Sequence, residues 1–486
     1  MTTRKRITQV RKLTDGDLFE AHLAAIGADL PFDRTLESGP QSVLAQPVTV
    51  PLGPAGSRTI GNRFATLPME GWDATTDGKP TDLVTRRWQR FGASGAKLIW
   101  GGEAVAVADE GRANPNQLRI GPDTIKQIAG LRSALVESHR ESFGTTDDLV
   151  VGLQLTHSGR FARPLGLPAP RVAYAHPWLD QRVKTTAADI MSDEELDHLV
   201  DLFVDAAEMA QGAGFDFVDV KSCHGYLLHE LLTGFDRPGA YGGDFEGRTR
   251  LLRRTIETIR NRFPDLGVGV RLSIFDLAPF SGGPDGAGLP DEQAEYPYAF
   301  GGDGTGVGID LQESDRLLGL LTDLGVAMLC VSAGSPYYCP HVSRPAYFPP
   351  SDGYLPPNDP LVDVARLLSA TADLKSRHPA MVMIGSGYSY LQEWVPNVAQ
   401  AQVRNNGVDL VGLGRMTLSY HDLPADILRG VEVDRRRICR TFSDCTTAPR
   451  NGLISGCFPL DEHYKSMPVR TELTKAKREA DAGRRR

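Results

Sequence analysis

Short apolar runs alternate with amphipathic, helix-like stretches along most of this chain. Each run is followed by a polar loop and a stretch with helical spacing, which is typical of parallel βα units with buried strands. Eight such units predict an α/β fold, a closed (βα)8 TIM barrel. The runs lie at residues 64–67, 97–100, 149–155, 215–220, 268–272, 327–332, 381–385 and 410–414.

The same pattern predicts what surrounds the barrel. Residues 46–52 and 58–64 flank a Gly-Pro-Ala-Gly-Ser turn, which indicates an N-terminal hairpin. Ser192 and Glu195 form a capping-box pattern ahead of apolar residues at helical spacing, so we expect a helix before the run at 215–220. We expect three parts: an N-terminal extension at 1–45, the barrel at 46–434, and a C-terminal cysteine-containing tail at 435–486.

Composition and charge narrow the class of protein. The 486 residues fit one barrel with insertions, because such barrels can exceed about 400 residues. A net charge of −8 argues against non-specific binding of nucleic acid. The chain has no run of about 20 apolar residues, its basic start lacks the apolar core of a secretory signal, and six cysteines do not make a disulfide scaffold. We expect a cytoplasmic protein that acts on a small molecule, with no membrane or nucleic-acid partner.

The end of the predicted strand at 215–220 carries a concentration of reactive side chains. Lys221, Cys223, His224 and Tyr226 follow it within six positions. In a parallel barrel, the carboxyl ends of the strands are where chemistry takes place. A cation, an imidazole and a phenol can together polarise an acceptor and donate a proton, so Lys221, His224 and Tyr226 are candidate catalytic residues. We interpret Cys223 as a small buried side chain.

Two glycine-rich loops at consecutive strand ends suggest a phosphate site. Gly385, Ser386 and Gly387 end one predicted strand, and Gly414 and Arg415 end the next. Glycine lets backbone N–H groups approach an anion closely, and an arginine can pair with it. The alternative is that these glycines only turn the chain.

Two further polar residues lie at predicted strand ends. Gln154 and Arg271 would be costly to bury in a barrel mouth without partners. They either bind a ligand or form hydrogen bonds within the protein. Five further side chains fit the wall of a pocket and the core equally well: Trp72, Trp100, Tyr337, Tyr338 and Cys339.

At this point the chain resembles the old yellow enzyme family, the flavin-dependent ene-reductases. Seven stretches match in order over roughly residues 45–430, and together they are far more specific than any one alone. They are GNRF with PM at 61–69, GEAV at 102–105, LQL with HSGR at 153–160, HGYL at 224–227, YGG at 241–243, VRLS at 270–273 and VGLGR at 411–415.

The resemblance implies a barrel that holds FMN noncovalently and takes electrons from NADH or NADPH. It places Pro68, Met69 and Ala104 against the isoalloxazine, Gln154 at its pyrimidine edge and Arg271 near N1 and C2=O, where negative charge develops. It assigns the phosphate to the glycine loops and Arg415. Tyr226 matches the family's proton donor. The resemblance also implies a homo-oligomer.

Lys221 departs from the family pattern. The family usually has a histidine there, followed three residues later by the histidine or asparagine that His224 matches, and the pair grips the carbonyl or nitro group of the substrate. Lysine is a flexible point charge, whereas imidazole is a rigid directional donor. One hypothesis is that Lys221 favours an anionic acceptor such as a carboxylate. The alternative is that it replaces one donor by another or pairs with a nearby acid.

Glu70 is a second departure, because the family usually has threonine or cysteine beside flavin C4=O and N5. An ionised carboxylate there would resist addition of electrons to the flavin, and burial would raise its pKa unless a cation compensates. Lys221 is the candidate cation, so we include Glu70 among the expected flavin contacts and hypothesise a compensating pair. In the alternative, Glu70 turns to solvent.

Three cysteines in the tail resemble part of an iron–sulfur motif. Larger relatives such as trimethylamine dehydrogenase and 2,4-dienoyl-CoA reductase bind a 4Fe–4S cluster through four cysteines with similar spacing. Here Cys439, Cys445 and Cys457 occupy three positions, and Phe442 occupies the fourth. Three thiolates cannot supply four cysteine ligands, so we expect no metal. A three-ligand cluster and a zinc site with an additional ligand are the alternatives.

Taken together, the residues and the resemblance predict an FMN-dependent oxidoreductase. Hydride would pass from NAD(P)H through flavin N5 to an activated C=C bond, while Tyr226 donates a proton. A first alternative is oxidative chemistry on an amine or a saturated acid. A second is a flavin-binding subunit without turnover.

Overall fold

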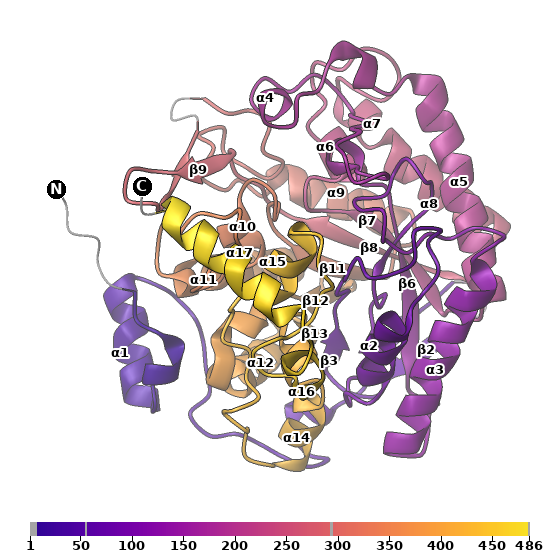
Figure 1. The fold of residues 1–486 in the computed structure, drawn as a ribbon. Helices are drawn as coiled ribbons and strands as arrows, with labels where there is room; N and C mark the ends of the chain where they lie inside the picture. Colours follow the sequence, from indigo (N-terminus) through magenta and orange to yellow (C-terminus); the bar gives the residue numbers. More distant parts are fainter. Residues whose placement is uncertain (1–6, 54–55, 292–294, 485–486) are drawn as a thin grey trace.

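A closed parallel β-barrel forms the centre of the structure (Figure 1). The computed structural model describes residues 7–53, 56–291 and 295–484. Eight strands pair around the barrel in chain order, and β13 pairs back with β3 to close it. All eight predicted strands and the α/β barrel are thereby confirmed. The strands are β3 (Phe64–Thr66), β4 (Leu98–Ile99), β6 (Val150–Thr156), β7 (Phe217–Ser222), β8 (Gly267–Ser273), β11 (Met328–Ser332), β12 (Val382–Gly385) and β13 (Leu410–Leu413).

Helices follow the strands and surround the barrel, as Figure 1 shows. The predicted capping box begins α5: the Ser192 hydroxyl accepts from the N–H of Glu195 at 3.2 Å, and the N–H of Ser192 donates to the Glu195 carboxylate at 2.7 Å. These bonds satisfy two backbone donors that a helix start leaves unpaired. The outer helices are α2 (Asp82–Gly92), α3 (Ile125–Phe143), α5 (Asp193–Gly212), α8 (Arg250–Arg262), α9 (Gln312–Asp323), α11 (Pro360–Arg377), α12 (Val395–Arg404) and α14 (Leu423–Arg429).

The predicted N-terminal hairpin closes the amino end of the barrel. Strands β1 (Val48–Pro51) and β2 (Ser57–Ile60) pair antiparallel, with Val48 opposite Ile60. Val50 and Leu52 pack in the same cluster as the inward-facing Trp100 and Phe217. Side chains of the hairpin and of the strands therefore pack together at this end of the barrel.

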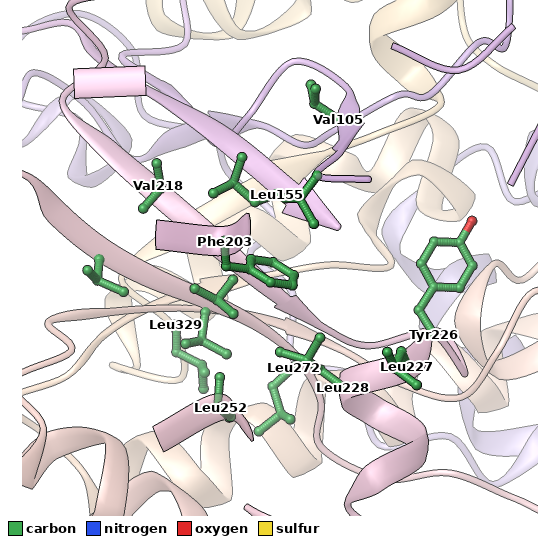
Figure 2. Close-up of a cluster of buried hydrophobic side chains, with 14 of the residues drawn as sticks. Val105, Leu155, Phe203, Val218, Tyr226, Leu227, Leu228, Leu252, Leu272 and Leu329 are labelled. Atoms are coloured by element: carbon green, nitrogen blue, oxygen red, sulfur yellow. The ribbon is translucent and has the colours of Figure 1, made fainter. Parts of the chain in front are cut away.

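A large apolar cluster joins the barrel to the helices around it. Figure 2 shows part of it, with Leu155 and Val218 from the barrel beside Phe203 of α5. Tyr226 lies at the edge of this cluster, and its hydroxyl oxygen points away from the aliphatic side chains. The apolar layer holds the carbon skeleton of Tyr226 in place while its hydroxyl stays available for polar contacts.

Short elements fill the connections near the barrel mouth. The strand β5 (Ala104–Ala106) pairs with β6, and β9 (Phe280–Gly282) forms a hairpin with β10 (Gly288–Pro290). The remaining helices are α1 (Gly16–Ile26), α4 (Leu179–Val183), α6 (Leu227–Leu231), α7 (Phe245–Arg248), α10 (Pro340–Ser343), α13 (Met416–Ser419), α15 (Asp444–Arg450), α16 (Glu462–Lys465) and α17 (Arg470–Arg484).

Both terminal segments pack on the barrel through specific contacts. The ring of Phe19 in α1 stacks on Trp394 with 4.3 Å between centroids. In the C-terminal segment, Asp461 accepts two hydrogen bonds from Arg86 of α2, at 2.9 and 3.0 Å. Among the helices of the described ranges, none combines the length and the apolar composition needed to cross a bilayer.

Candidate active site at the barrel mouth

One cavity at the carboxyl ends of the strands collects most of the predicted site residues. Its wall contains eight of them, together with Trp72, Tyr337 and Arg344. Met69 and the two glycine loops lie outside this wall. The eight are Pro68, Glu70, Ala104, Gln154, Lys221, His224, Tyr226 and Arg271.

The end of β7 positions the three candidate catalytic side chains. His224 has a left-handed backbone (φ 68°), which is uncommon for a residue other than glycine. Its N–H donates to the Ser273 hydroxyl at 3.1 Å, and its carbonyl accepts from the Ser335 hydroxyl at 2.8 Å. The ring nitrogen Nε2 is 2.9 Å from the hydroxyl of Ser332. Bonds from two neighbouring strand ends therefore hold His224 in a strained conformation, as is common at functional sites.

Tyr226 and Lys221 are in direct contact. The ammonium Nζ of Lys221 lies 3.9 Å from the centre of the Tyr226 ring, a cation–π geometry. Both residues are buried, at 4% and 3% exposure. Burial lowers the pKa of Lys221 and raises the pKa of Tyr226, so the phenol is protonated at neutral pH. Tyr226 is therefore in the form that can donate a proton.

Glu70 faces the same cavity and does not turn to solvent. Its carboxylate accepts from the indole N–H of Trp72 at 2.7 Å. Burial raises the pKa of Glu70, and the charge of Lys221 opposes that rise. The same attraction opposes the lowering of the Lys221 pKa. Opposite charges at these two positions support the hypothesis of a compensating pair.

A buried ion cluster fixes the segment that carries Glu70. The N–H of Gly71 donates to the Glu103 carboxylate at 3.1 Å, and Arg87 donates to both Glu103 and Asp73 at 2.6 and 3.0 Å. Trp72 between them has a positive φ of 53°. The cluster holds this strained turn, and with it Glu70, against the cavity.

Asp219 is an important residue that the sequence analysis missed. It is fully buried in β7, where its carboxylate accepts from the amide of Gln154 at 2.5 Å and from the indole of Trp100 at 2.7 Å. It also accepts from the backbone N–H of Arg271 at 2.6 Å. Because the side-chain nitrogen of Gln154 donates its hydrogen bond to Asp219, the side-chain oxygen of Gln154 remains free to accept one from a ligand. An aspartate inside an apolar strand run was the available signal.

The two glycine loops meet at adjacent strand ends, as predicted for a phosphate site. Strands β12 and β13 pair with Gly385 opposite Val411, and the N–H of Met416 donates to Ser389 at 3.2 Å across the two loops. A Cβ at Gly412 would lie 2.4 Å from the carbonyl oxygen of Gly385, so this approach requires glycine. The guanidinium of Arg415 donates to the Pro345 carbonyl at 2.8 Å.

Unpaired buried donors beside these loops fit an anionic group. Nη1 of Arg415, and Nε and Nη2 of Arg344, are buried without a hydrogen-bond partner among the residues that the structure describes. Burial and the charges of Arg415 and Arg450 lower the pKa of Arg344 to about 9. Two close guanidinium groups with unused donors need an anion. The Nε of Arg271, on the wall of the same cavity, is also buried and has no hydrogen-bond partner among the described residues. These residues fit the phosphate and the electron-accepting end of a flavin mononucleotide.

The C-terminal tail supplies part of the cavity wall. It is lined by four residues of α15: Cys445, Thr446, Pro449 and Arg450. No pattern in the sequence indicated that the tail reaches the site. Burial is the largest cause of the raised pKa of Cys457, and the charges of Cys439 and Cys445 raise it further. The three thiols therefore lie near one another. Within the described ranges, no group of three or more histidine, cysteine or acidic side chains is arranged to hold a metal ion.

Comparison with known proteins shows which family this barrel resembles. Residues 46–282 match the sequence model of the NADH:flavin oxidoreductase / NADH oxidase family. An NADPH dehydrogenase of Halalkalibacterium halodurans is 31% identical over 223 residues, which cover 45% of this chain and 61% of that protein. Over these residues the chain is similar to this family of flavin oxidoreductases.

Two further comparisons extend over more of this chain. An NADH:flavin oxidoreductase of Gibberella zeae is 26% identical over 397 residues, covering 74% of this chain and 86% of that protein. The solved structure of the old yellow enzyme homologue from Zymomonas mobilis aligns with a TM-score of 0.53 at 20% identity, over 80% of this chain and 94% of that one. The match to the NADPH dehydrogenase spans about three fifths of that relative. These comparisons indicate FMN as the cofactor and NADH or NADPH as the electron donor.

Proposed function

We propose that this old yellow enzyme relative is an FMN-dependent ene-reductase. It would oxidise NADH or NADPH and reduce an activated C=C bond. The observation that carries this proposal is the place of Tyr226, a buried protonated phenol in one cavity with Lys221, Gln154 and Arg271. The site residues expected from the sequence thus share one cavity or lie in the loops beside it, which supports a single site for flavin and substrate.

Each side chain has a distinct part in the proposed reaction. When bound, FMN supplies the transfer of a hydride from the nicotinamide to the β-carbon of the acceptor. Tyr226 donates the proton to the α-carbon, and Lys221 and His224 polarise the activating group. Arg271 stabilises negative charge at the electron-rich end of the cofactor site, and Gln154 accepts a hydrogen bond there. Arg415, Ser386 and the glycines around them hold the phosphate.

An anaerobic titration of the purified holoprotein tests the reaction class. The protein is reduced with NADH or NADPH, and flavin absorbance is followed while alkenes activated by ketone, nitro, ester or carboxylate groups are added. We expect a nicotinamide to bleach the flavin and an alkene to restore its colour.

Other outcomes would redirect the assignment. A flavin that neither nicotinamide bleaches but an amine does would contradict the reductase and favour oxidative chemistry. A photoreduced flavin that no alkene reoxidises would favour a binding protein without turnover.

A further inference from the structure

Tyr337 is the direct hydrogen-bonding partner of the proposed proton donor. Its hydroxyl lies 3.0 Å from the hydroxyl of Tyr226. The ring of Tyr337 stacks on Phe161, with 4.0 Å between centroids and 6° between planes. The guanidinium of Arg450 lies on the Tyr337 ring at 5.5 Å from its centre. Contacts from the turn after β6 and from the C-terminal tail therefore hold the phenol of Tyr337 in position.

Tyr226 needs a route to recover a proton. After it donates, a phenolate remains in a cavity where burial and the charge of Glu70 both disfavour it. Lys221 lies on the face of the ring, where its charge is attracted to the π-electrons of the phenol. The hydroxyl of Tyr337 is 3.0 Å from the Tyr226 hydroxyl, and the side chain of Ser158 also lies close enough to lower the pKa of Tyr226.

Tyr337 also connects the inner cavity with a second one. This outer cavity is bounded by residues 113–116, by Arg163 and by the tail at residues 449–454. The two cavities share four wall residues: Trp72, Tyr337, Pro449 and Arg450. The side chain of Arg163 is exposed, so the outer cavity is open to water.

We propose that Tyr337 returns the proton given up by Tyr226, so that the two phenols link the inner cavity to the outer one. As the acceptor's α-carbon gains its C–H bond, the O–H bond of Tyr226 breaks and its electron pair stays on oxygen. The hydroxyl proton of Tyr337 then moves to Tyr226, and water from the outer cavity protonates Tyr337 and leaves as hydroxide. The hydride comes from the reduced nicotinamide, so this inference rests on the proposed function.

The charges around Tyr337 are consistent with this task. Glu70 and Tyr226 face it from the inner cavity, and Arg163 and Arg450 face it from the outer one. Burial and Glu70 raise the pKa of Tyr337 to about 12. The outer cavity's acids are paired, Asp73 with Arg87 and Asp352 with Arg450. Tyr337 is thus protonated at neutral pH and able to donate.

Rapid mixing of Tyr337→Phe holoenzyme tests the relay. Tyr226 begins protonated in the variant, so the first reoxidation of reduced flavin by an alkene should keep nearly the wild-type rate. Steady-state turnover should fall at least about tenfold, because each cycle must wait for reprotonation by a slower route. Flavin reduction by the nicotinamide should not change. The matched control is Tyr338→Phe, whose hydroxyl donates to Asp276 at 2.5 Å outside the cavity and whose loss should leave both rates unchanged.

Each alternative result has a separate meaning. A first turnover and a steady state slowed by the same factor would show a structural role and overturn the relay, as would no change in either. In wild-type enzyme, D₂O should slow steady-state turnover by a larger factor than it slows the first reoxidation, because only repeated turnovers include the transfer from Tyr337 to Tyr226. Equal factors would contradict the proposal even if the variant were unstable. If wild-type reduced flavin reacts with no alkene, the proposed function itself fails, and the relay with it.

Discussion

Glu70 and Lys221 place opposite charges in one cavity, and neither matches the residue that old yellow enzymes usually have at its position. Glu70 is fixed by Trp72, and its carboxylate is electrostatically coupled to Lys221. This arrangement supports a role for Lys221 in offsetting a negative charge beside the flavin. It lessens the case that Lys221 is reserved for an anionic substrate.

Glu70→Gln should make the flavin easier to reduce. Removing a negative charge near the flavin raises its midpoint potential by a few tens of millivolts, since about 30 mV corresponds to about 1.4 kcal/mol for two electrons. The difference in potential between wild type and variant should be present above the pKa of Glu70, which burial raises. It should vanish below that pKa, where the protonated glutamate is neutral, as glutamine is at every pH. Spectroelectrochemical titration at several pH values measures this. Glu141→Gln, at an exposed position on α3, is the control, and equal potentials at high pH would refute the role of Glu70.

His157, at the end of β6, gives a pH dependence of stability. It is fully buried, its Nδ1 accepts from the N–H of Gly159 at 3.2 Å, and burial lowers its pKa to about 4 from 6.5. The unfolded chain therefore binds more protons between those values, and the stability present above pH 6.5 is lost as pH falls toward 4. For this residue the loss between pH 7 and pH 5 is about 2 kcal/mol. His157→Gln should remove that part of the loss in urea unfolding; an unchanged pH slope would contradict the assignment.

At the scale of elements, the proposed phosphate site lies where the loops after β11, β12 and β13 meet. The sequence predicted the loops after β12 and β13 from their glycines. It could not indicate Arg344, which lies in a proline-containing loop after β11 and looks like any other arginine in the chain. Its importance comes from packing, which buries two of its nitrogen atoms without partners.

Arg344→Gln should weaken FMN more than riboflavin. If Arg344 binds the phosphate, the loss of a buried charged partner costs about 2 kcal/mol or more, which is roughly thirtyfold in the dissociation constant of FMN. Riboflavin lacks the phosphate and should bind the variant and the wild type equally. Fluorescence titration of apoprotein with each flavin provides the measurement. Equal weakening for both flavins would point to general loss of structure instead of a phosphate contact.

The sequence pattern predicted elements more fully than it predicted the site. Apolar runs set the eight strands, because a strand buried on both faces must be apolar, and the capping box set the start of α5. The site depends on contacts between residues far apart in the chain. Asp219 orients Gln154 from a neighbouring strand, and α15 reaches the cavity from more than 200 positions beyond Tyr226. Such contacts follow from closure of the barrel and not from local spacing.

At the scale of the whole molecule, the segments outside the barrel are packed parts of the structure. Phe19 is fully buried and stacks on Trp394, whereas its neighbour Leu18 is 48% exposed. Phe19→Ala should lower the free energy of unfolding by about 3 kcal/mol, through lost burial and a remaining cavity. Leu18→Ala should change it by less than about 0.5 kcal/mol. Urea unfolding compares the two, and equal effects would mean that α1 does not contribute to the stability of the barrel.

The tail extends the same principle to function, since α15 closes one side of the cavity that contains Tyr226. In the proposed function the barrel would supply the flavin contacts, and the tail would supply part of the wall that faces the substrate. We therefore expect the tail to take part in substrate selection.

The most direct test of this account compares wild type and Tyr226→Phe in the two half-reactions, by anaerobic rapid mixing. We predict that reduction of the flavin by the nicotinamide is unchanged in the variant. Reoxidation by an activated alkene should be slower by about 10² to 10⁴-fold, the usual contribution of a general acid. Equal reoxidation rates in the two proteins would contradict Tyr226 as the proton donor.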